Sequence, residues 1–200
     1  MARITGPKCR MCRRSGVKLY LKGTRCDSDK CTLNRRPYAP GQHGNARSRK
    51  SDYGLQLREK QKAKWTYGIL ERQFRKYITK AMESKGITGE NLYRTLESRL
   101  DNVIFRSGLA VSRAQARQMA RSGLFMINDR VAKTPSHAVR PGDVVKPVDF
   151  SKVHLREGFI LPEWISANVK GRYITYERYP TLEDFDGNYE IQSIIDFYSR

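Results

Sequence analysis

The chain has 200 residues, of which 39 are Lys or Arg and 20 are Asp or Glu, so its net charge is +19. No apolar run approaches the ~20 residues of a membrane span, and the N-terminal MARITGPKCRMCRR lacks the apolar segment of a secretory signal. We therefore expect a soluble, intracellular protein with one large or two small domains. The excess positive charge predicts a polyanionic partner, and nucleic acid is the usual one.

The positive charge is concentrated at the start of the chain. Residues 1–80 carry 22 Lys or Arg and 5 Asp or Glu, a net charge of +17, whereas residues 151–200 carry a net charge of −2. Few acidic residues are interleaved with the basic ones, which favours a binding surface over a merely solvated one. The sequence therefore places the main binding surface in the first 80 residues.

Four cysteines lie within this basic region in the pattern C-x2-C, thirteen residues, C-x4-C: Cys9, Cys12, Cys26 and Cys31. Two close pairs can supply four thiolates to one tetrahedral ion, and the surrounding cations favour thiolate over thiol. We therefore predict a closed, structural Zn²⁺ site. An iron–sulfur cluster, two disulfides and free structural thiols are the alternatives, although disulfides fit an intracellular chain poorly.

Residues 34–51, NRRPYAPGQHGNARSRKS, contain only three apolar positions and several helix-breaking Pro and Gly residues. Such a segment buries too little surface to offset its ordering entropy, so alone it is expected to be mobile. Phosphate contacts would fix it through its five cations, which are Arg35, Arg36, Arg47, Arg49 and Lys50. The three histidines are scattered and are interpreted as surface residues or RNA contacts: His43, His137 and His154.

Three helices are predicted next. Residues 51–67 are strongly basic, with Ser51 or Asp52 as a cap. Residues 70–85 carry an apolar stripe and end at Gly86. The same spacing from Leu92 to Ile104 predicts one further amphipathic helix.

The segment VSRAQARQMARSG predicts a short helix in which Ser112 and Gln115 form a capping box. Ala116, Met119 and Ala120 are expected to face a core. Three arginines recur every four residues and form an unpaired stripe that is a candidate phosphate-binding face: Arg113, Arg117 and Arg121.

Short strands follow this helix. FMINDRV alternates and turns at Asn128-Asp129, which predicts a hairpin. Asp is poorer than Gly in a type I′ turn, so we expect another turn type there. A second turn, Pro141-Gly142-Asp143, precedes further strand residues. The fold class is predicted to be α+β: a zinc-bearing N-terminal arm, a mainly helical domain, and a small module of two helices plus a short antiparallel sheet.

Motifs along nearly the whole chain resemble the family of ribosomal protein S-four of the bacterial small subunit, in its zinc-bearing form. They run from MARITGPKC and PGQHG through SDYGLQLREKQK and ESRLDNVIFRSGLAVSRAQARQ to the terminal IIDFYSR. The resemblance implies three segments: an arm over 1–48, a helical domain over 49–96 on which 185–200 packs back, and an inserted RNA-binding module over 97–184. Residues 146–190 are the most divergent.

The family resemblance also implies a function. The protein would be a primary binder of small-subunit rRNA at a multi-helix junction in the 5′ domain, would nucleate assembly of the subunit body, and would be located in the cytoplasm on the ribosome. It would contact neighbouring small-subunit protein five and so influence decoding accuracy. Arg47, Arg49 and Lys50 would line the channel through which mRNA enters. No small-molecule substrate, membrane or homo-oligomer is expected.

The residues expected to contact RNA are mostly basic and come from all three segments. They are Arg3, Lys8, Arg10, Arg13, Arg14, Lys22, Arg35, Arg36, Gln42, His43, Arg47, Arg49, Lys50, Tyr53, Arg58, Lys60, Lys62, Arg72, Arg113, Arg117, Arg121 and Lys170.

Two other functional classes share some of these sequence features. Arg99-Leu100-Asp101 resembles the catalytic triplet of one pseudouridine synthase class, but no residues remain to build a catalytic domain, and we interpret Asp101 as a helix-surface or salt-bridge residue. We therefore expect a non-enzyme. A zinc-bearing DNA-binding regulator shares the charge and the cysteines, but no histidine-bearing finger or base-reading helix is evident.

Overall fold

The computed structural model describes residues 4–46, 49, 51–153, 156, 158–168 and 172–199. The chain divides into two compact units. The first comprises Met1–Gly89 and Asp186–Arg200, and the second Glu90–Phe185. Among the described residues, no helix has both the length and the apolar character needed to cross a membrane.

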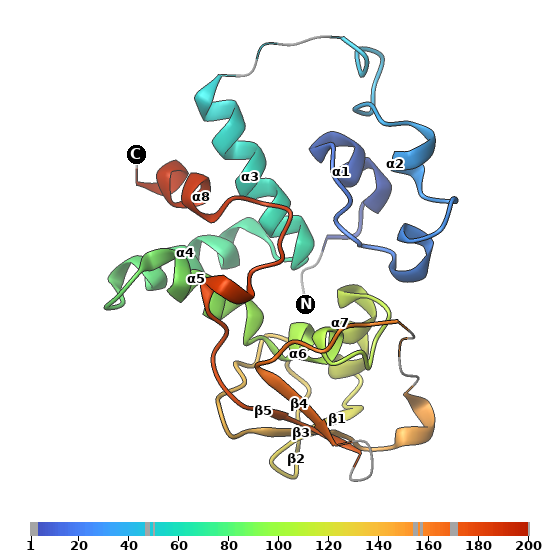
Figure 1. Cartoon of the computed structure of the whole chain (residues 1–200), viewed down its shortest axis with the longest axis vertical. Coiled ribbons are helices and arrows are strands. Elements are labelled where there is room, and N and C mark those ends of the chain that lie inside the picture. The colour runs from blue at the N-terminus through green and yellow to red at the C-terminus, as the bar shows by residue number, and fades with distance from the viewer. Residues whose placement is uncertain are drawn as a thin grey trace. The chain divides into compact units, whose positions relative to one another are not determined.

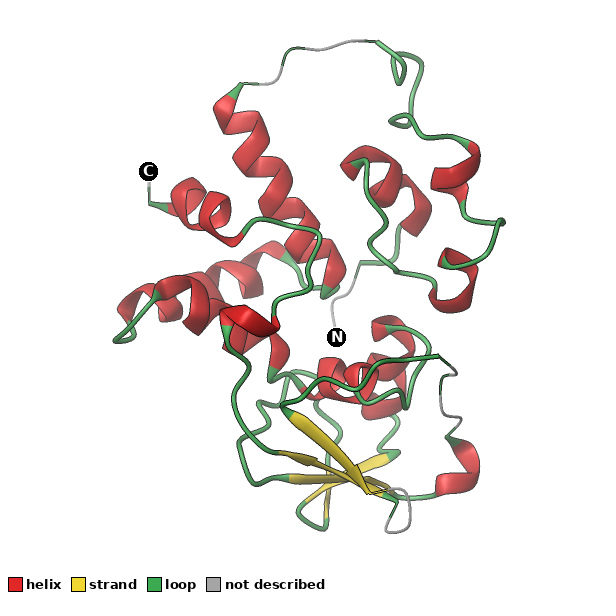
Figure 2. Ribbon diagram, in the orientation of Figure 1, coloured by secondary structure: helices red, strands yellow, loops and turns green. Residues whose placement is uncertain are grey.

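The first unit is built from helices (Figures 1 and 2). Its elements are α1 Lys8–Ser15, the 3-10 turn η1 Gly23–Cys26, α2 Thr32–Arg35, α3 Asp52–Thr66, α4 Glu71–Glu83 and, after the whole second unit, α8 Ile191–Tyr198. Helix α5, Thr88–Glu97, leads from this unit into the second.

The helices predicted over 51–67 and 70–85 are confirmed, for local reasons. The Ser51 side chain accepts a hydrogen bond from the Gly54 backbone N–H and so caps α3, as a Ser at this position is expected to do. The apolar stripe of α4 is buried through Phe74, Ile78 and Ala81.

The end of the chain returns to α3 (Figure 1). The Phe197 ring lies 5.4 Å from the Tyr53 ring, centroid to centroid. The Tyr189 and Tyr67 hydroxyls are 3.0 Å apart although 122 residues separate them in sequence. The first unit is therefore closed by residues from both ends of the chain.

The second unit combines helices with one antiparallel sheet (Figure 2). Its elements after α5 are α6 Leu100–Arg106, α7 Arg113–Arg121, β1 Phe125–Ile127, β2 Arg130–Val131, β3 Val144–Pro147, η2 Phe150–Lys152, β4 Ile165–Asn168, β5 Tyr173–Tyr176 and η3 Leu182–Asp184. The strand order is β2-β1-β3-β5-β4. The α+β class is thereby confirmed.

The prediction of one helix from Leu92 to Ile104 is wrong. Helix α5 ends at Glu97 and α6 begins at Leu100, with Arg99 in an extended conformation between them. The break is stabilised by backbone hydrogen bonds to a distant segment, from Leu100 N–H to the His137 carbonyl at 2.8 Å and from Val139 N–H to the Ser98 carbonyl at 2.8 Å. These partners are more than 30 residues away, so periodicity alone could not reveal the break.

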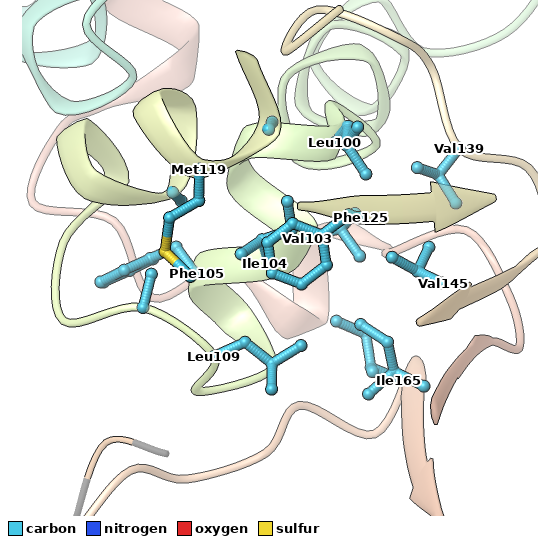
Figure 3. Close-up of a cluster of buried hydrophobic side chains, with 14 of the residues drawn as sticks. Leu100, Val103, Ile104, Phe105, Leu109, Met119, Phe125, Val139, Val145 and Ile165 are labelled. Carbon is cyan, nitrogen blue, oxygen red and sulfur yellow. The ribbon is translucent and has the colours of Figure 1, made fainter. Parts of the chain in front are cut away.

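The core of this unit lies between the two helices and the sheet (Figure 3). Val103 and Ile104 from α6, Phe125 from β1 and Val145 from β3 are almost completely buried. From α7, the three residues predicted to face a core, Ala116, Met119 and Ala120, are buried, as expected. This packing fixes which face of α7 is left for other contacts.

The β1–β2 hairpin corrects one expectation. Asn128 and Asp129 both have positive φ, 46° and 67°, which is the combination that a type I′ turn requires. Ile127 pairs with Arg130, so the loop has two residues. Asn and Asp tolerate the left-handed region better than other non-glycine residues, and the turn therefore forms without glycine.

Candidate nucleic-acid interface

The four cysteines line one cavity of about 20 Å³ in the first unit. Cys9 and Cys12 lie on α1, Cys26 ends η1, and Cys31 precedes α2. All four are free thiols, and all except Cys9 are buried. Within the described ranges, no group of three or more His, Cys, Asp or Glu residues is arranged as a metal site. The structure therefore does not support a zinc-bearing arm by its geometry, and the Zn²⁺ site stays a prediction.

Opposing effects act on the pKa values of the buried thiols. Burial raises the pKa of the Cys12 and Cys26 thiols, although backbone hydrogen bonds from Leu19 and Lys22 oppose this. The Lys22 N–H donates to Cys26 Sγ at 3.4 Å. Lys8, Lys22 and Arg25 also line the cavity. A donor set of four thiols with nearby cations and backbone N–H groups fits the chemistry of a tetrathiolate ion site.

Most of the predicted contacts in the N-terminal arm, and Arg49 directly after it, are exposed to solvent. They are Arg10, Arg14, Lys22, Arg35, Arg36, Gln42, His43 and Arg49. Lys8 is half-buried, and its Nζ donates to the Ile4 carbonyl at 2.8 Å. Four further predicted contacts, and one of the histidines, lie outside the described residues: Arg3, Arg47, Lys50, Lys170 and His154.

Arg13 has a structural role in this arm. Its Nε donates to the Tyr38 carbonyl at 2.9 Å, and its guanidinium lies 5.0 Å from the Tyr38 ring centroid. It therefore ties α1 to the Pro- and Gly-rich segment that follows the cysteines, and part of that segment is held by the protein itself.

Helix α3 presents some of its predicted contacts and buries another. Tyr53 on α3 and Arg72 on α4 are exposed, whereas Arg58 and Lys62 are half-buried and Lys62 pairs with Glu59. The expectation that Lys60 faces a ligand needs correction. Only 8% of its side chain is exposed, because Nζ pairs with Glu71 at 2.8 Å and lies 4.7 Å from the Phe197 ring centroid.

The arginine stripe of α7 is present, but two of its three members are not unpaired. The Arg113 Nε donates to Asn102 Oδ1 at 2.7 Å, and its guanidinium lies 4.4 Å from the Phe105 ring centroid. The Arg117 Nη1 lies 3.5 Å from Asp101 Oδ2. Arg121 is exposed. The expectation of an unpaired stripe is therefore wrong for Arg113 and Arg117, whose orientation is fixed by α6.

A buried polar network holds these arginine partners in place. Glu97, which is completely buried, accepts hydrogen bonds from Asn102 Nδ2 at 2.8 Å and from Arg106 Nε at 2.9 Å. Asp101 accepts two hydrogen bonds from Arg99, at 3.0 and 2.7 Å. Asp101 is thus a buried salt-bridge residue, which is one of the two roles expected for it.

Sequence reasoning missed Glu97 and Asn102. The available signal was their position, since both interrupt an otherwise apolar stripe close to Leu96 and Leu100. A polar residue on a core-facing stripe is expected to be paired.

The α7 capping interaction is confirmed in part. Ser112 Oγ accepts from the Gln115 N–H at 3.3 Å, whereas Gln115 Oε1 accepts from the Val111 N–H at 2.9 Å. The return bond of the box is therefore made one residue before the cap. The start of α7, and with it Arg113, is fixed from both sides.

Exposed cations on loops and helices, a net charge of +19 and a small helix-and-sheet module together define a protein that binds a polyanion. Residues 3–97 match the family described as Ribosomal protein S4/S9 N-terminal domain, and residues 98–145 match the S4 domain.

Full-length relatives support this match. The chain is 49% identical to small ribosomal subunit protein uS4 of Thermotoga maritima over 210 residues and 50% identical to that of Natranaerobius thermophilus over 212 residues. It is 51% identical to small ribosomal subunit protein uS4A of Clostridium botulinum over 208 residues. Each alignment covers 100% of both proteins. The chain therefore belongs to the uS4 family of small ribosomal subunit proteins.

Family membership decides between the functional classes. The family consists of structural proteins of the small subunit, so the chain is not an enzyme, and its place is the cytoplasmic ribosome. The S4 domain is an RNA-binding module. The readings as a pseudouridine synthase and as a DNA-binding regulator are thereby set aside.

Proposed function

We propose that this chain is a primary rRNA-binding protein, which contacts a multi-helix junction in the 5′ domain of small-subunit rRNA and nucleates assembly of the subunit body. The observation that carries this proposal is the net charge of +17 in residues 1–80, together with the exposure of most cations in the N-terminal arm. Such a surface binds folded RNA by neutralising phosphates.

The two units would engage RNA in different ways. The arm offers exposed cations on loops with few internal partners, so it gains order when phosphates fix it. In the second unit Arg113 and Arg117 are already oriented by Asn102 and Asp101. Pre-oriented groups lose less conformational entropy on binding, which favours recognition of a fixed RNA shape.

We also propose that a structural Zn²⁺ is held by Cys9, Cys12, Cys26 and Cys31. Their shared cavity and the basic side chains around it support this. The ion would supply a crosslink between α1 and the start of α2 in an arm that has little apolar core of its own. Its chemistry would be structural, since all four ligand positions would be filled by protein.

Contacts with other parts of the subunit belong to the same proposal. Arg47, Arg49 and Lys50 would line the channel through which mRNA enters, and of these Arg49 is described and exposed. A contact with neighbouring small-subunit protein five would influence translational accuracy. These two assignments depend on the family resemblance alone.

Binding to the isolated 5′ domain of small-subunit rRNA tests the proposed function. The full chain is titrated at moderate salt with excess tRNA and excess duplex DNA as competitors. Tight binding that resists both competitors is expected. Binding abolished equally by either competitor would show that the attraction is only generic charge and would overturn the proposal.

A further inference from the structure

A basic pocket lies in the second unit between the β1–β2 hairpin and the loop that precedes β3. It has a volume of about 640 Å³, and its lining includes Arg130, Lys133 and Arg140. We propose that this pocket binds the phosphate backbone of RNA, as a subsite separate from the arginines of α7. The proposal rests on the rRNA-binding function proposed above and adds a second contact surface within the same module.

The three cations of this pocket are available to a ligand. All three side chains are exposed, and no ion pair joins them to a carboxylate among the residues that the structure describes. In the same unit, by contrast, Arg99 pairs with Asp101 and Arg106 pairs with Glu97. Three cations that form no ion pair among the described residues are therefore gathered at the pocket.

Nearby carboxylates do not neutralise these cations. Asp143, the one acidic residue of the lining, accepts hydrogen bonds from Asn128 Nδ2 at 2.7 Å and from the Arg140 backbone N–H at 2.8 Å. Asp129, at the hairpin turn, forms an ion pair with Lys146. The donors to Asp143 are neutral groups, so its carboxylate keeps one negative charge against the three cations of the lining, and the pocket has a net positive charge.

The same hydrogen bonds make the pocket a pre-formed one. Asn128 Oδ1 accepts from the Val144 N–H at 2.9 Å while its Nδ2 donates to Asp143. One amide therefore joins the hairpin turn to the Pro141-Gly142 turn, and it fixes the backbone on both sides of the opening. A ligand that enters this site need not order the loops, which reduces the entropic cost of binding.

The lining indicates which part of RNA would bind. The lining contains no Phe, Tyr or Trp, and its one aromatic ring is the imidazole of His137, so it offers little surface for stacking bases compared with its three cations. Arg and Lys instead suit phosphate oxygens, and phosphate contacts position a protein on RNA without reading sequence. The volume lies within the range of ~300–1,000 Å³ that is typical of ligand pockets. A phosphate of the RNA backbone therefore matches the charge of the site.

The main test replaces Arg130→Gln, Lys133→Gln and Arg140→Gln together in the full chain and measures binding to the 5′ domain of rRNA over a series of salt concentrations. We expect the affinity at moderate salt to fall by roughly tenfold or more. The slope of log K against log salt should become shallower by about 2–3. The thermal unfolding midpoint should stay unchanged, because these exposed side chains form no ion pair with any residue that the structure describes.

A matched control removes the same charge elsewhere in this unit, through Lys152→Gln, Arg172→Gln and Arg178→Gln. These cations already interact with Asp149, the Phe150 ring and Asp184. The control should lose much less affinity. Equal losses of rRNA affinity in both variants, or no loss in the pocket variant, would overturn the subsite. Tight binding by the wild-type chain would still support the rRNA-binding function in that case. Failure of the wild-type chain to bind would instead overturn that function.

A second measurement uses the unmodified sequence and so does not depend on how the variants fold. Lysines are labelled with an amine-reactive reagent in the free chain and in its rRNA complex, and the sites are read by mass spectrometry. Lys133 should be protected by RNA while Lys152 stays reactive. Unchanged labelling of Lys133 in a saturated complex would overturn the proposal. That result would also be expected if the natural occupant of the pocket were an acidic protein and not RNA.

Discussion

Arg113 and Asn102 are joined by a hydrogen bond of 2.7 Å from the arginine Nε to the amide Oδ1, and the same amide donates to the buried Glu97 carboxylate at 2.8 Å. The orientation of an arginine on α7 is thus set by a carboxylate at the end of α5, through one intervening side chain. The module's basic face therefore depends on its buried network, and mutations in that network are expected to affect both stability and RNA binding.

The arginines of α7 should differ in what they contribute to stability. Arg113→Gln should lower the free energy of unfolding by about 1–3 kcal/mol, because it leaves a buried acceptor on Asn102 without this donor. Arg121→Gln, at an exposed position, should change it by no more than about 0.5 kcal/mol. Urea unfolding of the full chain measures both. Equal effects of the two variants would show that the Arg113 hydrogen bond does not stabilise the unit.

Glu97 should be among the most sensitive positions of the second unit. Glu97→Gln removes the buried counter-charge of Arg106, whose side chain is only 14% exposed. Breaking a buried ion pair from one side costs about 3–5 kcal/mol. Glu90→Gln is the control, because Glu90 pairs with Arg94 on the more exposed surface of α5, where such a pair contributes about 0.3–0.5 kcal/mol. Chemical unfolding that gives similar values for the two variants would contradict a structural role for the network.

The stability of the first unit should depend on pH through Glu71. Burial alone would raise the pKa of this carboxyl, but hydrogen bonds from Lys60, Lys64 and Tyr198 together lower it to about 2. Because the folded-state pKa lies below the unfolded value, the stabilisation is fully present above about pH 4.5 and is lost as the pH falls towards 2. The contribution should stay near 1 kcal/mol or less, since the Glu71 side chain is 46% exposed and water screens it.

Unfolding midpoints of the wild type and of Glu71→Gln, measured at intervals from pH 6 to pH 2.5, test this expectation. The wild type should be the more stable at pH 6, and the difference should shrink steadily as the pH falls below 4.5. A difference that does not vary with pH would mean that the carboxylate charge contributes nothing.

Loss of the proposed zinc should loosen the N-terminal arm. The purified wild-type chain is expected to contain about one Zn²⁺ per molecule by elemental analysis, and the double variant Cys9→Ser, Cys12→Ser should contain none. Without the ion, cleavage by trypsin within residues 4–46 should accelerate and affinity for rRNA should fall.

The wild-type chain treated with a chelator is the matched control, and it should behave as the double variant does. Visible absorbance with iron in place of zinc would identify the iron–sulfur alternative. A metal-free wild-type chain with the same resistance to trypsin and the same RNA affinity as the variant would contradict the zinc site.

The sequence by itself determined the features that depend on near neighbours. Ser51 and Ser112 cap their helices through backbone N–H groups three residues away, and the buried stripes of α4 and α7 follow from spacing within one helix. The α+β class follows from the periodicity of apolar residues, the basic N-terminal region from the distribution of charge, and the family from sequence motifs. All of these signals are local or compositional, and they need no knowledge of how distant segments meet.

Only the tertiary structure decided which polar groups are paired. The break between α5 and α6 depends on backbone hydrogen bonds to the segment around His137 and Val139, and Lys60 is buried because α8 returns from the far end of the chain. Two members of the arginine stripe meet α6 partners, and the pocket forms because Asn128 reaches Asp143 across fifteen residues. Long-range contacts in the folded chain determine which cations are paired and which remain available to RNA. These contacts join residues far apart in sequence, so they cannot be predicted from local sequence patterns.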